Sequence, residues 1–397
     1  MNSRVEYKRK LKIDLPHKQS AFFWGARKTG KSTYLKKHFP QSVYYDLLDT
    51  DLYLKYSKRP ALFREEVLAL SELELQRPIV VDEVQKIPLL LDEIHWLIEH
   101  TDAQFILCGS SARKLKRTAA NLLGGRAWRY SFYPLVYLEV PDFNLLTALN
   151  TGLIPSHYLS INPHKSLRAY VQDYLTQEIQ VEGLTRNLPV FARFLDTLAF
   201  SNGELVNFAN IARDCAIDAK TVKSYYEILV DTLLGYFVEP YARKKKRDLI
   251  AATPKFYLFD VGLAGILTQR TISALQGSDA GRAFEHFILM ELIAYRGIND
   301  LDFAVTFWRT KTGLEVDFVL SRDIAIEVKL GTAVDQTELR GLKAFCEEHS
   351  PDKAYVVSLD QAKRSIRFGK TEILILPYME FLRMLWDGKI FLHGVKT

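Results

Sequence analysis

The sequence has few cysteines and no long hydrophobic run. Its 397 residues include three cysteines, Cys108, Cys215 and Cys346, which lie far apart and form no C-x-x-C pair. This pattern argues against a disulfide framework or a zinc ribbon and favours a reducing compartment. No apolar run approaches the ~18 residues that span a bilayer, and no apolar segment follows the basic start at 1–14. We therefore expect a cytoplasmic protein with no membrane partner.

Internal repeats, low-complexity tracts and a strong charge of one sign are also missing. The chain has 53 Lys and Arg against 47 Asp and Glu, a net charge of +6, and 48% hydrophobic residues. This balance is typical of folded proteins and argues against a disordered, collagen-like or coiled-coil chain. The small positive surplus permits an anionic partner without requiring one.

Three regions differ in their hydrophobic pattern, and we predict a domain for each. Residues 1–150 alternate short apolar runs with helical stretches, which predicts an α/β domain with a parallel sheet. Residues 151–255 have the 3- and 4-residue apolar spacing of helices, and residues 256–397 return to mixed α/β texture. Expected strands in the first region are Ala21–Trp24, Val43–Tyr45, Ile79–Val81 and Phe105–Leu107.

The first region contains a complete phosphate-loop motif. Residues Gly25, Ala26, Arg27, Lys28, Thr29, Gly30, Lys31 and Ser32 match G-x-x-x-x-G-K-[ST], and a helical stretch continues from Thr33. Thr33 is expected to bind the nucleotide together with these residues. Backbone N–H groups of such a loop cradle phosphates, the lysine reaches the β- and γ-phosphates, and the serine hydroxyl binds Mg²⁺. The order strand, loop, helix favours an ATP and Mg²⁺ site over a glycine-rich loop that matches by chance.

Two other strand ends are expected beside this loop. Asp82 and Glu83 follow Ile79–Val81, so Asp82 is predicted to hold Mg²⁺ and Glu83 to polarise the attacking water as a general base. Ser110 or Ser111 is predicted to sense the γ-phosphate or the attacking water, with a helix N-cap as the alternative.

Arg126 follows two glycines between the fourth and fifth predicted strands. Ring-forming P-loop ATPases place at this point an arginine that acts on the nucleotide of a neighbouring subunit. The position therefore predicts self-association in a ring or dimer through Arg126. A surface salt bridge is the alternative.

The second region contains a helix-turn-helix pattern. Helices are predicted at 207–215 and 219–234, a strand at 235–241 and the tip of a wing at the basic run 243–247. A winged helix of this kind binds DNA with its second helix and contacts phosphates with its wing. The alternative is an internal packing module with a solvated basic loop.

The third region carries acids on two adjacent predicted strands, Leu314–Leu320 and Ile324–Leu330, joined by a three-residue loop. Strand alternation places Asp317, Glu327 and Lys329 together, where they suit Mg²⁺ and a phosphoryl group. The spacing D-(x)9-E-x-K resembles the restriction-endonuclease-like PD-(D/E)xK nucleases, although Val316 stands in place of proline. Such enzymes add an acid from a preceding helix, and here Glu285 is favoured over Glu291. An active nuclease and an inactive nuclease-like domain both remain open.

These features together resemble a bacterial and archaeal family of AAA-type ATP-binding proteins with a C-terminal domain of unknown function. The segments that carry the resemblance are 25–32, 81–85, 109–111, 124–126, 133–135, 255–263, 284–285, 308–318 and 327–329. The resemblance implies an ATPase core, a winged-helix unit and a nuclease-like domain. Two hypotheses follow: an Mg²⁺-dependent ATPase that couples nucleotide state to DNA engagement, with or without DNA cleavage, and a regulatory switch in which ATP binding engages a partner protein.

Overall fold

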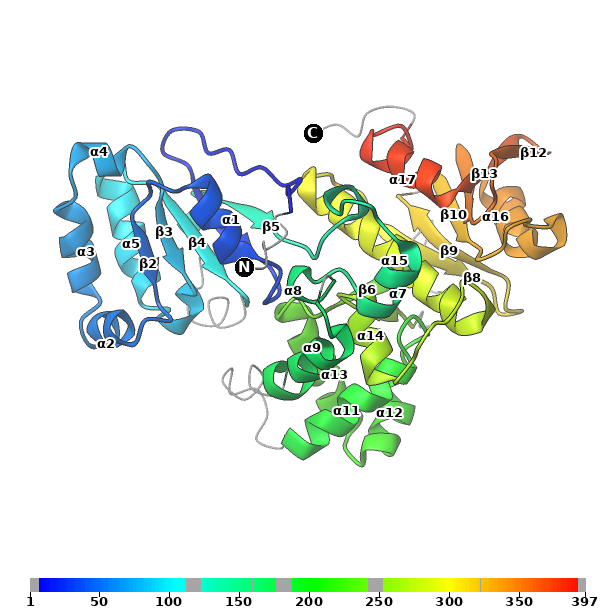
Figure 1. Cartoon of the computed structure of the whole chain (residues 1–397), viewed down its shortest axis with the longest axis horizontal. Helices are drawn as coiled ribbons and strands as arrows, with labels where there is room; N and C mark the ends of the chain where they lie inside the picture. The colour runs from blue at the N-terminus through cyan, green and yellow to red at the C-terminus, as the bar shows by residue number, and fades with distance from the viewer. Residues whose placement is uncertain are drawn as a thin grey trace. The chain divides into compact units, whose positions relative to one another are not determined.

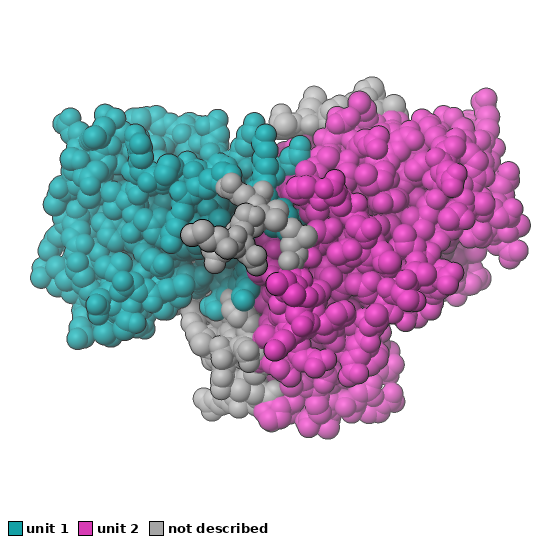
Figure 2. Space-filling view, viewed as in Figure 1, with its two compact units in different colours: residues 1–135, 229–234 teal, residues 136–228, 235–397 magenta. Residues whose placement is uncertain are grey.

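The computed structural model describes residues 7–111, 123–158, 160–175, 188–241, 253–321 and 323–391. Contacts divide the chain into two compact units, coloured separately in Figure 2. Unit 1 comprises residues 1–135 and 229–234, and unit 2 comprises residues 136–228 and 235–397. The predicted basic wing tip, 243–247, lies outside the described residues.

Unit 1 is built on a parallel five-stranded sheet of order β2-β3-β4-β1-β5. Its strands are β1 (Ser20–Trp24), β2 (Tyr44–Asp46), β3 (Ile79–Asp82), β4 (Phe105–Gly109) and β5 (Ala127–Ser131). The three central strands are buried throughout, which explains why the sequence shows them as continuous apolar runs rather than as alternating ones. The predicted parallel sheet is confirmed.

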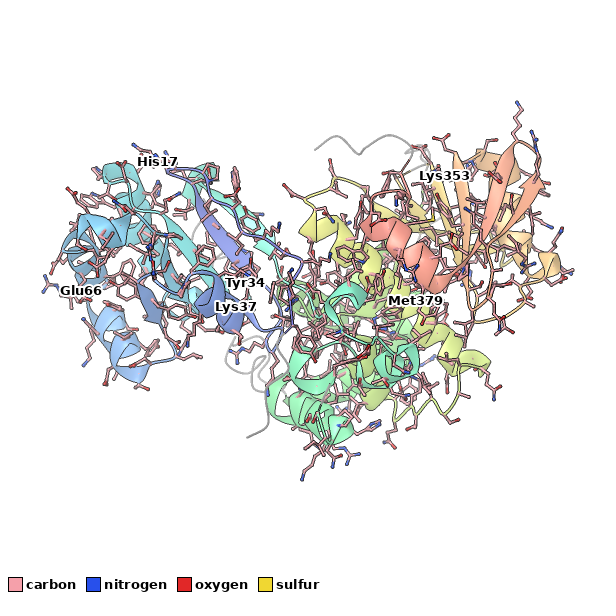
Figure 3. All side chains as sticks on the ribbon, turned by 45° about the horizontal axis from the view of Figure 1, so that its top comes forward. His17, Tyr34, Lys37, Glu66, Lys353 and Met379 are labelled. Carbon is pink, nitrogen blue, oxygen red and sulfur yellow. The ribbon has the colours of Figure 1, made fainter. Side chains whose placement is uncertain are left out.

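Helices cover both faces of this sheet (Figure 1). They are α1 (Lys31–His38), α2 (Thr50–Lys58), α3 (Ala61–Leu68), α4 (Glu72–Leu75) and α5 (Leu90–His100). On one face, Phe63 of α3 and Ile94 of α5 join the buried cluster that contains Phe105 of β4. On the other face, Phe23 of β1 contacts the ring of Tyr34, which Figure 3 labels on α1. The sheet is therefore fixed from both sides, and its carboxyl edge carries the phosphate loop.

Unit 2 begins with a helical region. Its helical segments are η3 (Tyr137–Glu139), α7 (Leu145–Thr151), α8 (Pro155–Tyr158), α9 (Pro163–Ala169), the π-helical η4 (Tyr170–Leu175), α11 (Leu188–Phe200), α12 (Phe208–Cys215), α13 (Ala219–Asp231) and α14 (Val261–Leu267). Helix α13 begins in unit 2 and its last residues are grouped with unit 1. Asp218 accepts a hydrogen bond from the Thr221 backbone N at 2.9 Å, so it caps α13.

A close crossing of α7 and α14 organises this helical region. Asp260 caps α14 by accepting from the Leu263 backbone N at 3.0 Å, and its other oxygen accepts from the Leu153 backbone N at 2.7 Å. A Cβ on Gly262 would lie 2.3 Å from both the backbone N of Gly152 and the backbone C of Thr151. Only glycine at position 262 allows the two backbones to approach this closely.

The rest of unit 2 forms an eight-stranded sheet of order β12-β13-β11-β10-β9-β8-β6-β7. The strands are β6 (Gly235–Pro240), β7 (Lys255–Leu258), β8 (Val305–Arg309), β9 (Glu315–Leu320), β10 (Ile324–Val328), β11 (Lys353–Ser358), β12 (Arg364–Phe368) and β13 (Thr371–Pro377), and the helices around them are α15 (Gly277–Ile298), η5 (Gln336–Leu339), α16 (Arg340–His349) and α17 (Tyr378–Trp386). Strands β9 and β10 form the predicted hairpin, with Leu320 opposite Ile324. Strand β12 is not predicted, because it is an edge strand whose residues are mostly exposed.

Candidate functional site

The phosphate loop connects β1 to α1 at the carboxyl edge of the unit 1 sheet. Gly30 has a φ of 95°, a conformation that glycine adopts without strain, and it stands directly before the first residue of α1. The Lys31 ammonium, 6% exposed, donates to the carbonyl oxygens of Gly25 at 2.6 Å and Ala26 at 3.1 Å. Lys31 is thus folded back over its own loop, within the cradle that the sequence assigns to phosphate.

The predicted magnesium ligands lie together. Ser32 Oγ donates to Asp82 Oδ2 at 2.7 Å, and the Tyr44 hydroxyl donates to the same carboxylate oxygen. Burial and the Asp82 charge raise the pKa of Tyr44, so its phenol keeps its proton and remains a donor. A hydroxyl and a carboxylate from two elements are the oxygen donors that Mg²⁺ uses beside nucleotide phosphates, and their closeness fits that ion.

Glu83 stands beside this pair in a left-handed backbone conformation, with a φ of 57°. It is 8% exposed, and one carboxylate oxygen accepts from the side-chain amide of Gln85. The same Gln85 amide donates to Ser110 Oγ at 3.2 Å, and Arg27 Nε donates to that hydroxyl at 3.3 Å. The predicted Glu83 and Ser110 are therefore joined through Gln85, a residue without a predicted role.

The N-terminal segment contributes a second residue that the sequence did not single out. Arg9 donates to the Thr29 carbonyl oxygen in the phosphate loop at 2.8 Å and to the Tyr133 carbonyl oxygen at 2.6 Å. Its guanidinium lies 3.8 Å from the centre of the Phe132 ring. The segment is tied to α1 as well, because the Tyr34 hydroxyl donates to the Leu11 carbonyl oxygen at 3.1 Å.

Arg126 lies at the opposite edge of the same sheet. Its backbone oxygen accepts from the Ser20 backbone N, at the start of β1, whereas the phosphate loop follows the end of β1 at Trp24. The Arg126 side chain forms an ion pair with Glu99. Within one chain Arg126 therefore does not reach the phosphate loop, and its action on a neighbouring copy stays a prediction.

Family models match three successive parts of the chain. Residues 17–140 match an AAA domain, residues 143–273 match a domain of unknown function (DUF8612), and residues 280–380 match another (DUF4143). The first match contains the parallel sheet, the phosphate loop and the Asp82–Glu83 strand end. The N-terminal part of this chain is an AAA domain.

The alignment to curated relatives is longer than the AAA match. Uncharacterized proteins of Mycobacterium tuberculosis and Mycobacterium bovis are each 27% identical over an alignment of 279 residues that covers 67% of this chain. The match spans 61% of the length of each relative.

The similarity to solved structures is weaker. The Walker-type ATPase PABY2304 of Pyrococcus abyssi has a TM-score of 0.40 and 16% identity, with 62% of this chain and 90% of that one covered. The ORC2 protein of Aeropyrum pernix has a TM-score of 0.37 and 10% identity, with 64% and 87% covered.

The acids predicted in unit 2 also gather, but with additional partners. Asp317, half-buried on β9, accepts from the Val328 backbone N at 2.7 Å, and Glu327, 5% exposed on β10, pairs with Lys329 at 2.7 Å. Burial and the charges of Glu327 and Glu285 raise the pKa of Asp317. Asp317, Glu327 and Lys329 therefore lie in one cluster, as the strand alternation predicts, and Glu285 of α15 lies there as well.

Strand β7 brings a lysine and a tyrosine into this cluster, neither of which the sequence analysis places there. Lys255 Nζ lies 2.5 Å from Glu315 Oε1 and 3.5 Å from Glu285 Oε1, and the Tyr257 hydroxyl donates to Glu285 Oε1 at 2.5 Å. Over the described ranges, no group of three or more His, Cys, Asp or Glu side chains is arranged to hold a metal ion. The acids in unit 2 already have cationic partners, since Lys255 pairs with Glu315 and Glu285, and Lys329 pairs with Glu327.

Glu291, the other glutamate on α15, has its partners outside the cluster. It is 1% exposed, and its two oxygens accept from the Trp386 indole N and the Tyr137 backbone N, each at 2.7 Å. Burial raises the pKa of Glu291 to about 8, against a usual value near 4.5. This carboxyl binds its proton more tightly in the folded state than in the unfolded state.

The raised pKa of Glu291 predicts a pH dependence of stability. The contribution of Glu291 is fully present below about pH 4.5 and is lost as the pH rises through about 8, because the folded state then holds a buried charge. We expect Glu291→Gln to reduce the fall in unfolding free energy between pH 5 and pH 8, measured by urea denaturation. An identical fall in wild type and variant would contradict the assignment.

Among the residues that the structure describes, no helix is both long enough and apolar enough to cross a membrane.

Proposed function

We propose that the AAA domain binds ATP with Mg²⁺ and hydrolyses it. The observation that carries this proposal is the hydrogen bond between Ser32 and Asp82 beside the phosphate loop. Glu83 is the residue that follows Asp82. Bound Mg²⁺ would neutralise charge that develops on the transferred phosphoryl group. We assign its binding to Ser32 and Asp82.

The remaining residues of the site have distinct roles in this proposal. Lys31 leaves the carbonyl oxygens of Gly25 and Ala26 and donates to the β- and γ-phosphates. Glu83 accepts a proton from the attacking water. Gln85 positions Glu83 relative to Ser110, the residue that we assign to the γ-phosphate.

We propose further that nucleotide state is coupled to DNA through the middle of three domains, 1–150, 151–255 and 256–397. In support, α12 and α13 follow each other across a tight turn at Ala216, with a φ of 55°, and the β6–β7 hairpin comes next. Lys220 and Lys223 are exposed on α13. The alternative is a regulatory switch that engages a partner protein.

Cleavage of DNA by Asp317, Glu327, Lys329 and Glu285 is the second candidate function. The gathering of these residues favours it, whereas the position of Lys255 among the acids favours the inactive, nuclease-like alternative. Cleavage of duplex DNA with Mg²⁺ by wild type, lost in Asp317→Asn, would establish the nuclease.

ATP turnover with Mg²⁺ tests the main proposal. We expect Lys31→Ala to lower turnover about 100-fold, because the charge that stabilises the transferring phosphoryl group is lost. Lys58→Ala, an exposed lysine on α2, is the matched control and should retain wild-type turnover. Undiminished turnover in Lys31→Ala would overturn the assignment. Repeating the assay with duplex DNA distinguishes coupling to DNA from coupling to a partner protein. Only coupling to DNA predicts that DNA changes the rate of ATP turnover.

A further inference from the structure

We propose that the Lys255 ammonium is the resident cation of the acidic cluster in unit 2, and that it keeps divalent metal ions out while β7 is in place. The cluster is defined by Glu285, Glu315, Asp317 and Glu327. This inference does not depend on ATP hydrolysis, because every residue in it belongs to unit 2.

The position of Lys255 is fixed by the backbone of its strand. β7 is hydrogen-bonded to β6 in antiparallel register, with Lys255 opposite Val238, and Lys255 also forms a bridge with Leu205. The lysine is 4% exposed. A buried ammonium is costly unless carboxylates pair with it, and here Glu315 and Glu285 lie within ion-pair distance. Although burial disfavours the charged form, the nearby acids raise the pKa of Lys255 above its usual value, so it stays protonated.

The charges in the cluster are largely compensated without a metal. Arg309 pairs with Glu315 at 3.2 Å, and Lys329 pairs with Glu327 at 2.7 Å. With Lys255, three cationic groups thus face the four acids. A divalent ion would have to enter beside a buried ammonium, where the repulsion between like charges is only weakly screened.

One carboxylate oxygen among the described residues of the cluster accepts no hydrogen bond. Among the described residues, Glu327 Oε2 is buried and receives no hydrogen bond, while its Oε1 pairs with Lys329. A buried carboxylate oxygen without a donor is unfavourable in a folded protein. This oxygen, with Asp317 and Glu285, is what a divalent ion would bind once Lys255 is removed.

The cation and the acids come from different matched segments. Lys255 lies in residues 143–273, whereas all four acids lie in residues 280–380. The middle segment therefore closes a site that belongs to the C-terminal segment, and displacement of β7 would open it.

Binding of Mn²⁺ to the full chain without nucleotide tests this proposal by electron paramagnetic resonance. We expect Lys255→Met to bind one more Mn²⁺ per chain than wild type, and the double variant Lys255→Met/Asp317→Asn to lose that ion. The melting temperature of Lys255→Met should rise with Mn²⁺ through the same site. Lys363→Met, an exposed lysine in the same unit, should match wild type.

Two results would overturn the proposal. One is equal Mn²⁺ binding by wild type and a Lys255→Met variant whose circular dichroism shows a folded chain. The other is a Mn²⁺ ion that wild type binds and that Asp317→Asn does not bind. This result needs no Lys255 variant, so it would contradict the proposal even if Lys255→Met fails to fold. Equal Mn²⁺ binding by wild type and Asp317→Asn supports the proposal. Loss of ATP turnover in Lys31→Ala bears only on the AAA domain.

Discussion

Replacing Glu83 with Gln is expected to lower ATP turnover by about 100- to 10,000-fold and to leave ATP binding unchanged. The amide has nearly the shape of the carboxylate but cannot accept a proton from water. Lys31, Ser32 and Asp82, the residues assigned to phosphate and Mg²⁺, remain in place. The measurement is steady-state phosphate release, combined with a fluorescence titration of a labelled ATP analogue.

The matched control is Glu72→Gln, which makes the same change at an exposed position on α4. Its turnover should equal that of wild type. If Glu83→Gln hydrolyses ATP at the wild-type rate, Glu83 is not the general base. If the variant also fails to bind ATP, the substitution has disturbed the phosphate loop as well as the C-terminal end of β3.

A second large effect is expected where α7 crosses α14. Gly262→Ala should lower the free energy of unfolding by about 3 kcal/mol, because the new methyl group would overlap backbone atoms of Thr151 and Gly152. Backbone atoms cannot rotate away as a flexible side chain can, so the helices must separate.

Gly281→Ala provides a control of opposite sign. Gly281 lies within α15, and a Cβ there would meet no atom within 4 Å. Alanine is a better helix former than glycine, so this variant should gain about 0.5–1 kcal/mol. Urea denaturation of both variants gives the comparison, and a Gly262→Ala midpoint at the wild-type concentration would show that the crossing tolerates the methyl group.

The parts of the site that could be predicted are those in which neighbouring residues in the sequence form the motif. The Gly25–Ser32 motif and the apolar strand that ends in Asp82 each carry their signal within a few positions, so the parallel sheet and the loop at its carboxyl edge could be foreseen. The β9–β10 hairpin was also predictable, because Leu320 and Ile324 flank a short loop and alternation fixes which side chains share a face.

The residues that the sequence could not place act across long separations. Lys255 approaches Glu315 because β7 and β9 belong to one sheet, in which β6 and β8 lie between them. The hydrophobic periodicity of the sequence does not predict this strand order. Arg9 lies in a segment without regular structure, where local patterns carry no signal for a contact with Thr29. Gln85 follows Glu83 by two positions, and its role depends on the left-handed turn at Glu83.

The hydrogen bonds of Arg9 have a mechanical consequence for nucleotide binding. One guanidinium holds the Thr29 carbonyl oxygen of the phosphate loop and, at the same time, the carbonyl oxygens of Tyr133 and Pro134. Residues 133 and 134 immediately precede the end of the first segment of unit 1 at Leu135. Any movement of the loop at Thr29 would therefore pull, through Arg9, on residues 133 and 134, just before the chain leaves unit 1.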